Sequence, residues 1–258
     1  MKNYIFQTDP YEHQRECFDS SAEAGNFALL MDMGTGKTKV CIDTIALNFE
    51  ENRINFAVIV APKGVIANWV GEIQTHLPER IDRQVALWKP NLTKAKRKEL
   101  KDLAESNHKL KFLLMNIEAF STKKGVDVAE FFVKRYKTFM AVDESTSIKN
   151  RQAKRTKSIC SVGREAVMRR ILTGSPVTKS PMDLYSQMDF LDPRILGFKS
   201  YYAFQGRYAV VQRRTMGAHS FNHVLGFRHL DELTEKLDRH SYRVRKEDCL
   251  DLPDKVYM

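Results

Sequence analysis

Short, continuous runs of apolar residues alternate along the chain with longer stretches in which apolar residues recur every three or four positions. Six mainly apolar segments have the length of a β-strand: 27–31, 56–60, 85–88, 111–115, 138–142 and 166–172. Helical spacing predicts helices over 10–24, 40–49, 65–76, 128–136, 151–161 and 182–190, and a polar, basic helix that ends near 106. Strands that are apolar throughout and alternate with helices indicate a parallel sheet buried on both faces. We therefore expect an α/β fold with a doubly wound, mostly parallel sheet and helices on both faces.

The alternation of strands and helices stops beyond Leu191. Residues 193–228 are rich in aromatic residues and arginine, and four glycines interrupt them. They predict an irregular C-terminal appendage to the sheet domain. The elements expected in this part of the chain are a short helix over 200–206, a hairpin near 217, a short helix over 231–237 and an extended piece over 242–245.

The first strand leads into a glycine-rich turn, Asp32-Met33-Gly34-Thr35-Gly36-Lys37-Thr38, and a helix follows it. Glycines let backbone N–H groups turn inward around an anion, and the helix directs its positive end to the same point. In a nucleotide site, Lys37 would reach the β- and γ-phosphates and the Thr38 hydroxyl would hold Mg²⁺. The full phosphate-loop pattern begins with glycine at position 31, where this chain has Met31. The alternative is an ordinary glycine turn with a chance Gly-Lys-Thr.

An acidic pair, Asp143-Glu144, directly follows the apolar run over 138–142. A nucleotide site needs a carboxylate at a second strand end, where Asp143 can neutralise and orient Mg²⁺. The adjacent Glu144 can then draw a proton from a water molecule in line with the γ-phosphate. Two adjacent acids more often lie on a loop surface, but a strand before them and a phosphate loop upstream favour the catalytic interpretation.

The composition is that of a folded chain, with 43% hydrophobic and 29% charged residues. No apolar run approaches the roughly 18 residues that span a bilayer, and the first residues lack the apolar core of a signal peptide. We therefore expect no membrane partner. The four cysteines are scattered singly, which suggests reduced thiols in an intracellular protein.

The formal net charge is +10, which suits a polyanionic partner. Eight basic residues and one acid lie between Lys149 and Arg170, and a second basic cluster covers 94–98. The alternative for each cluster is a solvated helix face, and for the second cluster we favour that interpretation.

Several segments, in this order, resemble the motifs of superfamily 2 helicase-like ATPases, and specifically the first RecA-like lobe of the Swi/Snf family of DNA translocases. The turn over 32–38 resembles motif I of that family, in which the early glycine is usually missing. Motif II has Ser145-Thr146 where the family more often has Ala-His, and motif III has Ser175 where Thr is commoner. The other matching segments are Gln14 with its neighbours, 58–63 with Asn68-Trp69 and Glu72 (motif Ia), 143–150 (motif II), 172–177 (motif III), 183–185, 190–193, 243–250 and 252–255.

This resemblance implies roles for individual residues. The catalytic residues would be Lys37, Asp143 and Glu144. ATP would be bound by Gln14, which reads the adenine in this family, and by Met33, Gly34, Thr35, Gly36, Lys37 and Thr38. Mg²⁺ would be held by Thr38 and Asp143, partly through water. Coupling to the nucleic-acid groove would involve Thr173, Gly174 and Ser175, and nucleic acid would be contacted by Pro62, Lys63, Gly64 and Lys149.

The resemblance also implies a domain organisation. Residues 1–193 would form a RecA-like ATP-binding lobe, 194–240 a family-variable appendage or insertion, and 241–258 the segment that leads to a second RecA-like lobe. No second lobe follows before Met258. Because the second lobe supplies arginine fingers in this family, we expect the isolated lobe to hydrolyse ATP weakly or not at all.

The function implied is that of a nucleic-acid-dependent ATPase, a translocase or remodeller that acts on duplex DNA rather than on single strands. One alternative is an RNA-directed or strand-separating helicase lobe. Another is a non-hydrolysing module that binds nucleic acid or a protein partner, although such a scaffold would not need Lys37, Asp143 and Glu144 together. The compact motif spacing suggests a bacterial or phage protein in the cytoplasm of the bacterium or of the infected host cell.

Four further features of the sequence each allow two interpretations. Trp69 fits core packing better than a base-stacking platform, given its helical spacing. Turn 173–175 would equally serve as a helix cap. His219 and His223 are four residues apart, but without further ligands we treat them as unpaired. The last feature is a group of arginines and aromatic residues that would bind either nucleic acid or a second lobe: Arg207, Arg213, Arg214, Arg228, Tyr201, Tyr202 and Phe221.

Overall fold

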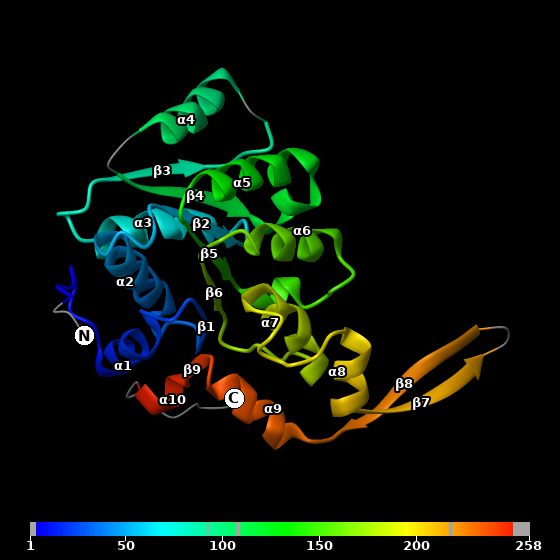
Figure 1. Cartoon of the computed structure of the whole chain (residues 1–258). Helices are drawn as coiled ribbons and strands as arrows, with labels where there is room; N and C mark the ends of the chain where they lie inside the picture. Colours follow the sequence, from blue (N-terminus) through cyan, green and yellow to red (C-terminus); the bar gives the residue numbers. More distant parts are fainter. Residues whose placement is uncertain (1–3, 92, 107–108, 217–218, 250–258) are drawn as a thin grey trace, which may run out of the picture.

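The computed structural model describes residues 4–91, 93–106, 109–216 and 219–249. A seven-stranded sheet in the order β3-β4-β2-β5-β6-β1-β9 forms its centre (Figure 1). Every pairing of neighbouring strands in this sheet is parallel, so the expected doubly wound α/β fold is confirmed. The strands are β1 (Asn26–Met31), β2 (Phe56–Ala61), β3 (Arg83–Leu87), β4 (Leu110–Asn116), β5 (Thr138–Asp143), β6 (Met168–Leu172) and β9 (Ser241–Val244).

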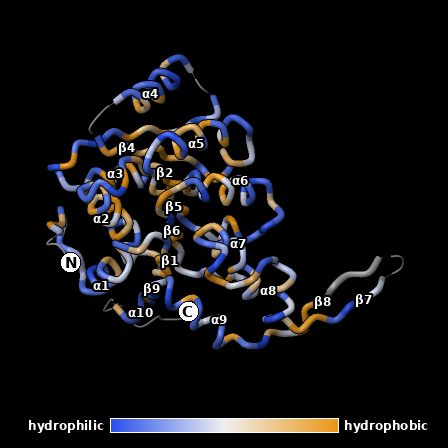
Figure 2. The backbone as a smooth tube through the Cα atoms, in the orientation of Figure 1, coloured by the Kyte–Doolittle hydropathy of each residue, from blue (hydrophilic) through white to orange (hydrophobic). Residues whose placement is uncertain are grey.

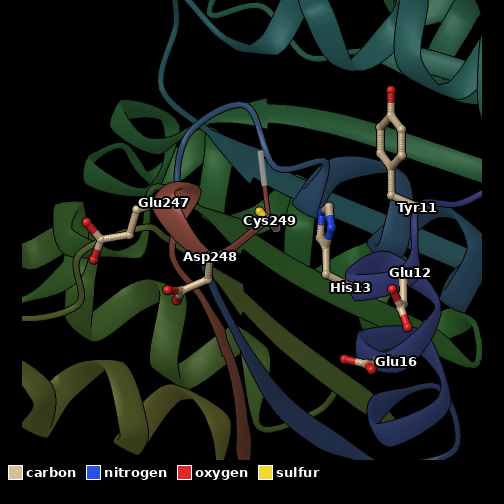
Figure 3. Close-up of a pocket in the computed structure, with 7 residues that line it drawn as sticks. All are labelled: Tyr11, Glu12, His13, Glu16, Glu247, Asp248 and Cys249. Atoms are coloured by element: carbon tan, nitrogen blue, oxygen red, sulfur yellow. The ribbon is translucent and has the colours of Figure 1, made fainter. Parts of the chain in front are cut away.

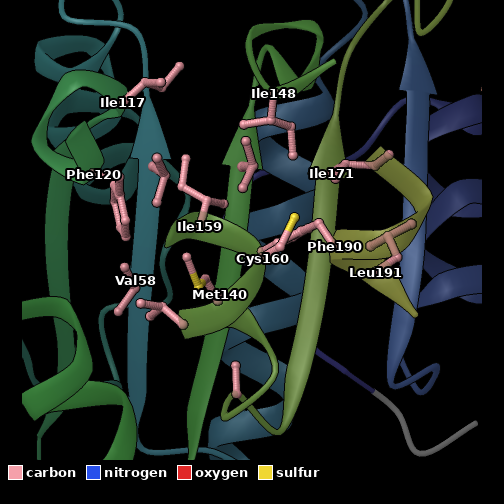
Figure 4. Close-up of a cluster of buried hydrophobic side chains, with 14 of the residues drawn as sticks. Val58, Ile117, Phe120, Met140, Ile148, Ile159, Cys160, Ile171, Phe190 and Leu191 are labelled. Atoms are coloured by element: carbon pink, nitrogen blue, oxygen red, sulfur yellow. The ribbon is translucent and has the colours of Figure 1, made fainter. Parts of the chain in front are cut away.

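Helices cover both faces of the sheet, because successive side chains of each strand point to opposite faces. Phe27, Leu29 and Met31 of β1 pack in one core with α1 (Glu12–Ser21), α2 (Lys37–Glu50) and α3 (Ile66–His76). Ala28 and Leu30 pack in the other core. Figure 4 shows part of that core, with Val58 of β2, Met140 of β5 and Ile171 of β6. The helices of that second face are α4 (Lys94–Glu105), α5 (Lys123–Arg135), α6 (Lys154–Gly163) and α7 (Leu184–Leu191).

Hydropathy follows this layering. The backbone is hydrophobic along the central strands and mainly hydrophilic along α4, which packs beside the edge strand β3 (Figure 2). In α4 only Leu103 is buried, so the polar, basic helix of the sequence analysis lies at the surface. No helix in the described part of the chain is long and apolar enough to cross a membrane.

The observed elements differ from the expected ones mainly at helix starts. Helix α2 starts at Lys37 rather than at position 40, because Gly36 adopts a left-handed conformation (φ 87°) and turns the chain directly into the helix. Helix α5 starts at Lys123 rather than at 128, because the Thr122 side chain accepts a 3.1 Å hydrogen bond from the Gly125 N–H and caps the helix. Both starts depend on local geometry that an apolar pattern does not show.

The C-terminal appendage contains more regular structure than the sequence analysis expected. Helix α8 (Tyr201–Tyr208) leads into an antiparallel hairpin of β7 (Ala209–Met216) and β8 (His219–Phe227), which projects away from the sheet (Figure 1). The expected turn near 217 falls outside the described residues, and the strands on either side of it are paired. Helix α9 (Leu230–Asp238) then returns the chain to the sheet, where β9 pairs with β1.

Strand β9 was expected only as an extended piece, and the sheet contains it as an edge strand. It is followed by α10 (Lys246–Cys249), whose first backbone N–H donates to Asp32 Oδ2 at 3.0 Å. The rest of the segment expected to lead to a second lobe, 250–258, lies outside the described residues. Short 3₁₀ helices also occur in the described residues: η1 (Ile117–Ser121), η2 (Ser145–Ile148) and η3 (Pro181–Asp183).

Candidate active site

The phosphate-loop turn connects the carboxyl end of β1 to the N-terminus of α2. Gly34 and Gly36 both have φ of 87°, a left-handed conformation that side chains other than glycine rarely adopt. Between them Thr35 is buried, and its hydroxyl donates to Asp32 O at 2.8 Å. The turn therefore has the two left-handed positions that a backbone cradle for an anion requires, and the α2 N-terminus lies directly behind it.

Helix α1 packs against this turn through Gln14. The buried Gln14 Nε2 donates to Thr35 O at 3.1 Å, and Gln14 Oε1 accepts from the Tyr11 N–H at 3.1 Å. His13 Nε2 lies 2.8 Å from the same Thr35 carbonyl. A Cβ at Gly36 would lie 2.2 Å from Gln14 Nε2, so the contact requires glycine there. The structure thus brings Gln14 to the phosphate loop.

Lys37 and Glu144 meet across the site. Lys37 Nζ lies 3.7 Å from Glu144 Oε1, and the Lys37 side chain is only 10% exposed. Glu144 has φ of 48°, an uncommon left-handed conformation for a residue other than glycine. This conformation ends β5 abruptly and directs Glu144 away from the strand, toward the lysine. Such backbone outliers are concentrated at functional sites.

Asp143 is buried at the end of β5, and both of its carboxylate oxygens accept hydrogen bonds. Oδ1 accepts from the Glu144 N–H at 2.9 Å, and Oδ2 accepts from Trp69 Nε1 at 2.9 Å. Within the described part of the chain, no lysine, arginine or histidine forms an ion pair with it. A buried carboxylate without a basic partner is suited to a divalent cation.

Trp69 is a site residue that the sequence analysis did not assign. Its ring is buried among core residues, as expected, but its indole N–H points to the carboxylate that we expect to manage the metal. A buried tryptophan usually finds a partner for its N–H, and that requirement was the available signal. The sequence could not show that the partner is Asp143, 74 positions later.

A pocket of about 270 Å³ lies between the phosphate loop and the start of α3. Phosphate-loop residues form one wall of this pocket, and α3 contributes Trp69 and polar side chains to the other. The residues that line it are Gly34, Gly36, Lys37, Thr38, Val65, Asn68, Trp69 and Glu72. The structure therefore gathers the loop, Lys37, Thr38 and the partner of Asp143 around one hollow.

A second pocket, of about 510 Å³, lies between α1 and α10 (Figure 3). Carboxylates dominate its lining, whereas the phosphate-loop pocket has Lys37. The residues that line it are Tyr11, Glu12, His13, Glu16, Glu247, Asp248 and Cys249. The sequence analysis did not assign these residues to a site, because α10 reaches α1 only after β9 has joined the sheet.

The turn after β6, expected to couple the two sites, lies against the start of the phosphate loop. The Thr173 N–H donates to Leu29 O at 3.1 Å, and Thr173 Oγ1 accepts from the Ser175 N–H at 3.3 Å. A Cβ at Gly174 would lie 3.1 Å from Asp32 Cα. Gly174 therefore lies against the start of the phosphate loop, and Thr173 also stabilises its own turn.

The residues expected to contact nucleic acid are not equally accessible. Lys63 and Gly64 are exposed after β2, and Pro62 O accepts the first N–H groups of α3. Lys149 instead interacts within the molecule, because its Nζ bonds to Thr178 Oγ1 and lies 4.0 Å from Asp183 Oδ2. Lys63 is thus the more available of the two lysines.

The basic residues counted between Lys149 and Arg170 do not form one surface. Arg170 is fully buried, and Arg151 packs over the ring of Tyr201 with its guanidinium carbon 4.2 Å from the ring centroid. Arg164 pairs with Asp189 at 3.2 Å. Arg170 belongs neither to a solvated helix face nor to a nucleic-acid-binding surface, because β6 places its side chain inside the protein.

The arginines of the appendage also separate into two groups. Arg207 pairs with Glu232, and Arg228 donates to Gly206 O at 2.7 Å, so these two secure the base of the hairpin. Arg213 and Arg214 are exposed on β7. The side chains of His219 and Phe221 lie outside the described part. Among described residues, no group of three or more His, Cys, Asp and Glu gathers as a metal site.

A family model described as "SNF2-related domain" matches residues 14–256. The chain is 30% identical over 172 residues to the probable ATP-dependent DNA helicase CHR12 of Arabidopsis thaliana. The aligned region covers 66% of this chain and 14% of that protein. The chain is 24% identical over 250 residues to the mouse DNA excision repair protein ERCC-6-like, covering 92% of this chain and 19% of that protein. The chain thus spans less than a fifth of either relative.

Two solved structures have the same fold. The Sulfolobus solfataricus SWI2/SNF2 ATPase core in complex with dsDNA superposes with a TM-score of 0.67 at 21% identity, covering 95% of this chain and 46% of that one. The SWI2/SNF2 ATPase core domain of the same organism superposes with a TM-score of 0.68 at 22% identity. The match covers 98% of this chain and 47% of that one. At these identities the likeness establishes the fold.

Proposed function

Because the chain belongs to the SNF2-related domain family, we propose that it is the ATP-binding and ATP-hydrolysing lobe of a helicase-like, DNA-dependent ATPase. The observation that carries the proposal is the meeting of three strand-end features: the left-handed glycine turn, Lys37 at 3.7 Å from Glu144, and the buried Asp143 without a basic partner. Each alone has a structural explanation. Together they supply a backbone cradle for an anion, a lysine to bind phosphate, a carboxylate to bind a metal ion and a second carboxylate to act as a base.

The two pockets sort the halves of a nucleotide by charge. The acid-lined pocket between α1 and α10 repels phosphate and accepts hydrogen bonds from the amino and hydroxyl groups of adenosine. The pocket beside Lys37 attracts phosphate, and the α2 N-terminus adds its own positive potential there. His13 lines the acid-lined pocket, and the side chains of His13 and Gln14 both contact the Thr35 carbonyl of the phosphate loop, whose residues Gly36 and Lys37 line the other pocket. This placement supports the assignment of Gln14 to the adenine end.

Glu144 is the general base in this proposal. Its side chain is 32% exposed, so a water molecule reaches it, and its Oε1 lies 3.7 Å from Lys37 Nζ, which lines the phosphate pocket. Thr38 and Asp143 are the residues that would hold Mg²⁺, which commonly binds through one or two protein oxygens and the phosphates themselves. A magnesium ion bound there supplies neutralisation of the phosphate charge.

Duplex DNA is the proposed polymer partner, and Lys63 with Pro62 and Gly64 is the proposed contact on this lobe. The net charge of +10, a relative named as a DNA helicase and a matched core solved with dsDNA support this choice. We also infer a second RecA-like lobe as the partner that closes the nucleotide site, because the matched ATPase cores are about twice as long as the matching region. RNA is the competing polymer.

The proposal is tested by nucleotide binding and by the polymer that stimulates hydrolysis. Lys37→Ala is expected to weaken ATP binding at least about tenfold, because a charge-assisted contact to phosphate contributes roughly 1.5–3 kcal/mol. Titration of a fluorescent ATP analogue measures this, with Lys98→Ala on the exposed face of α4 as the matched control. Equal affinity of Lys37→Ala and wild type would overturn the site assignment. Hydrolysis stimulated by RNA alone, and not by duplex DNA, would overturn the DNA assignment.

Trp69→Phe is expected to raise the Mg²⁺ concentration needed for half-maximal nucleotide binding about tenfold or more, since partners that orient a metal ligand commonly contribute 10- to 100-fold. Phenylalanine keeps the aromatic packing but removes the N–H that orients Asp143 Oδ2. Trp88→Phe is the matched control, because Trp88 is also buried but its Nε1 has no hydrogen-bond partner in the described structure. An unchanged Mg²⁺ requirement in Trp69→Phe would show that the indole serves packing alone.

A further inference from the structure

Gln187 on α7 joins two loops that the proposed function assigns to different tasks. Its side chain is fully buried, and Gln187 Oε1 accepts from the Ser145 hydroxyl at 2.6 Å. On the other side of the amide, Nε2 donates to Pro176 O at 2.7 Å and to Asp183 O at 2.8 Å. One rigid, planar group therefore connects the residue after Glu144 with the loop after β6.

The same turn of α7 holds both loops by further bonds. The Ser186 hydroxyl donates to Ile148 O at 2.6 Å, and so secures the far end of the loop that begins at Glu144. Asp183 Oδ2 accepts from the Thr178 and Lys179 N–H groups at 3.0 and 2.9 Å, and so secures the loop after β6. These two attachments do not pass through Gln187. Lys149 Nζ also links the two loops, through Thr178 Oγ1, but that contact is only partly buried, so the Gln187 amide is the fully buried bridge between them.

An apolar side chain could fill the buried position of Gln187 without introducing polar atoms that need partners. A buried amide is costly unless its donors and acceptors are satisfied, and here both N–H donations and the carbonyl acceptance are made. Such a network tolerates only discrete arrangements, because a partial shift leaves a buried group unpaired. A displacement of Pro176 therefore turns the amide and acts on Ser145, one residue from the strained Glu144.

We propose that Gln187 is a positioning residue that transmits the state of the 173–178 loop to Glu144 through Ser145. The inference rests on the proposed function, in which Glu144 acts on ATP and the 173–178 loop responds to nucleic acid. It adds a named path: Pro176 carbonyl, Gln187 amide, Ser145 hydroxyl. Ser145 is one of the positions at which motif II of this chain departs from the usual family pattern, which more often has alanine there.

The double variant Ser145→Ala/Gln187→Leu tests this bridge. Ser145→Ala leaves Gln187 Oε1 without its donor, whereas Gln187→Leu leaves the Ser145 hydroxyl unpaired and also removes the donor to Pro176 O and Asp183 O. Replacing both partners of a buried hydrogen bond by apolar groups is often nearly neutral for that bond. We therefore expect the double variant to melt at a higher temperature than Gln187→Leu. Thr156→Val is the control, because Thr156 is buried on α6 and its hydroxyl has no partner in the described structure.

The readout is the ratio of the ATP-analogue dissociation constants of the whole chain without and with a saturating 30-base-pair duplex. Allosteric coupling between two sites typically changes affinity about 5- to 150-fold, and we expect a ratio in this range for wild type and for Thr156→Val. For the double variant we expect a ratio near one, with the separate affinities for nucleotide and for duplex kept. A purely structural bridge predicts instead that the double variant, once its stability is restored, couples as wild type does.

The failures of the two proposals are distinguishable. Wild type that binds no nucleotide overturns the proposed function, and this inference with it. Wild type that binds nucleotide and duplex without coupling, or a double variant that couples as strongly as wild type, overturns only the role of Gln187. Loss of coupling in a double variant that is folded at the assay temperature and keeps both affinities supports it.

Discussion

Glu144→Gln is expected to lower the rate of ATP hydrolysis about 10²- to 10⁴-fold while leaving ATP affinity within a few-fold of wild type. General acid–base catalysis by one positioned side chain contributes about that much to a rate. Glutamine keeps the size of the side chain and removes only its ability to accept a proton. Lys37 lies 3.7 Å from Glu144 Oε1, so loss of the carboxylate also releases the lysine, which remains available to phosphate. Single-turnover hydrolysis of radiolabelled ATP in the presence of duplex DNA measures the rate, with this lobe joined to the second RecA-like lobe that we infer as its partner.

The matched control for this change is Glu165→Gln. Glu165 is exposed after α6 and outside both pockets, so its substitution is expected to leave hydrolysis unchanged. If Glu144→Gln hydrolysed ATP at the wild-type rate, another group would have to accept the proton and the assignment of Glu144 would fall. If it lost ATP binding together with hydrolysis, Glu144 would serve to bind the nucleotide instead.

Arg170→Met is expected to lower the free energy of unfolding by about 3 kcal/mol, the largest stability change that we predict. The buried guanidinium donates to Ser21 O at 2.7 Å, Ala24 O at 2.6 Å, Gly25 O at 3.1 Å and Arg169 O at 2.9 Å. Burial lowers the pKa of Arg170 to about 10, so the group is still charged at neutral pH. Methionine fills much of the space but leaves these carbonyls without a donor.

Urea denaturation measures the change as a lower midpoint with an unchanged slope. The control is Arg169→Met on the same strand, because the half-buried Arg169 side chain makes one bond, from Nε to Asn26 Oδ1 at 3.1 Å. It should cost about 1 kcal/mol. Equal midpoints for the two variants would mean that the four carbonyl contacts do not stabilise the fold. One of those carbonyls, Ser21 O, ends α1, and two, Ala24 O and Gly25 O, lie between α1 and β1, so Arg170→Met should also loosen the contact of Gln14 with the phosphate loop.

The strands, the parallel sheet and the phosphate loop could be predicted because each depends on neighbours in the sequence. A strand buried on both faces is apolar along nearly all of its length, as 139–142 is. A left-handed turn needs glycine, as at 34 and 36. The acidic pair after β5 was recognisable for the same reason, since carboxyl ends of parallel strands meet at one edge.

Residues with long-range partners could not be assigned in this way. Trp69 was correctly expected in the core, but the direction of its N–H toward Asp143 depends on how α3 packs over β5. Lys149 was expected at nucleic acid, and the fold places Thr178 and Asp183 beside it. Arg170 raised the count of basic residues, although its guanidinium lies inside the protein.

The sequence by itself determined the order of elements, the anion cradle and the identity of the acids, because short-range sterics and apolar burial act on adjacent residues. Only the tertiary structure decided which polar groups meet: Gln14 with the phosphate loop, Trp69 with Asp143, and Ser145 with Gln187. A hydrogen bond needs its two atoms within about 3 Å and a favourable angle. Residues tens of positions apart satisfy that requirement only after the sheet order and helix packing are established.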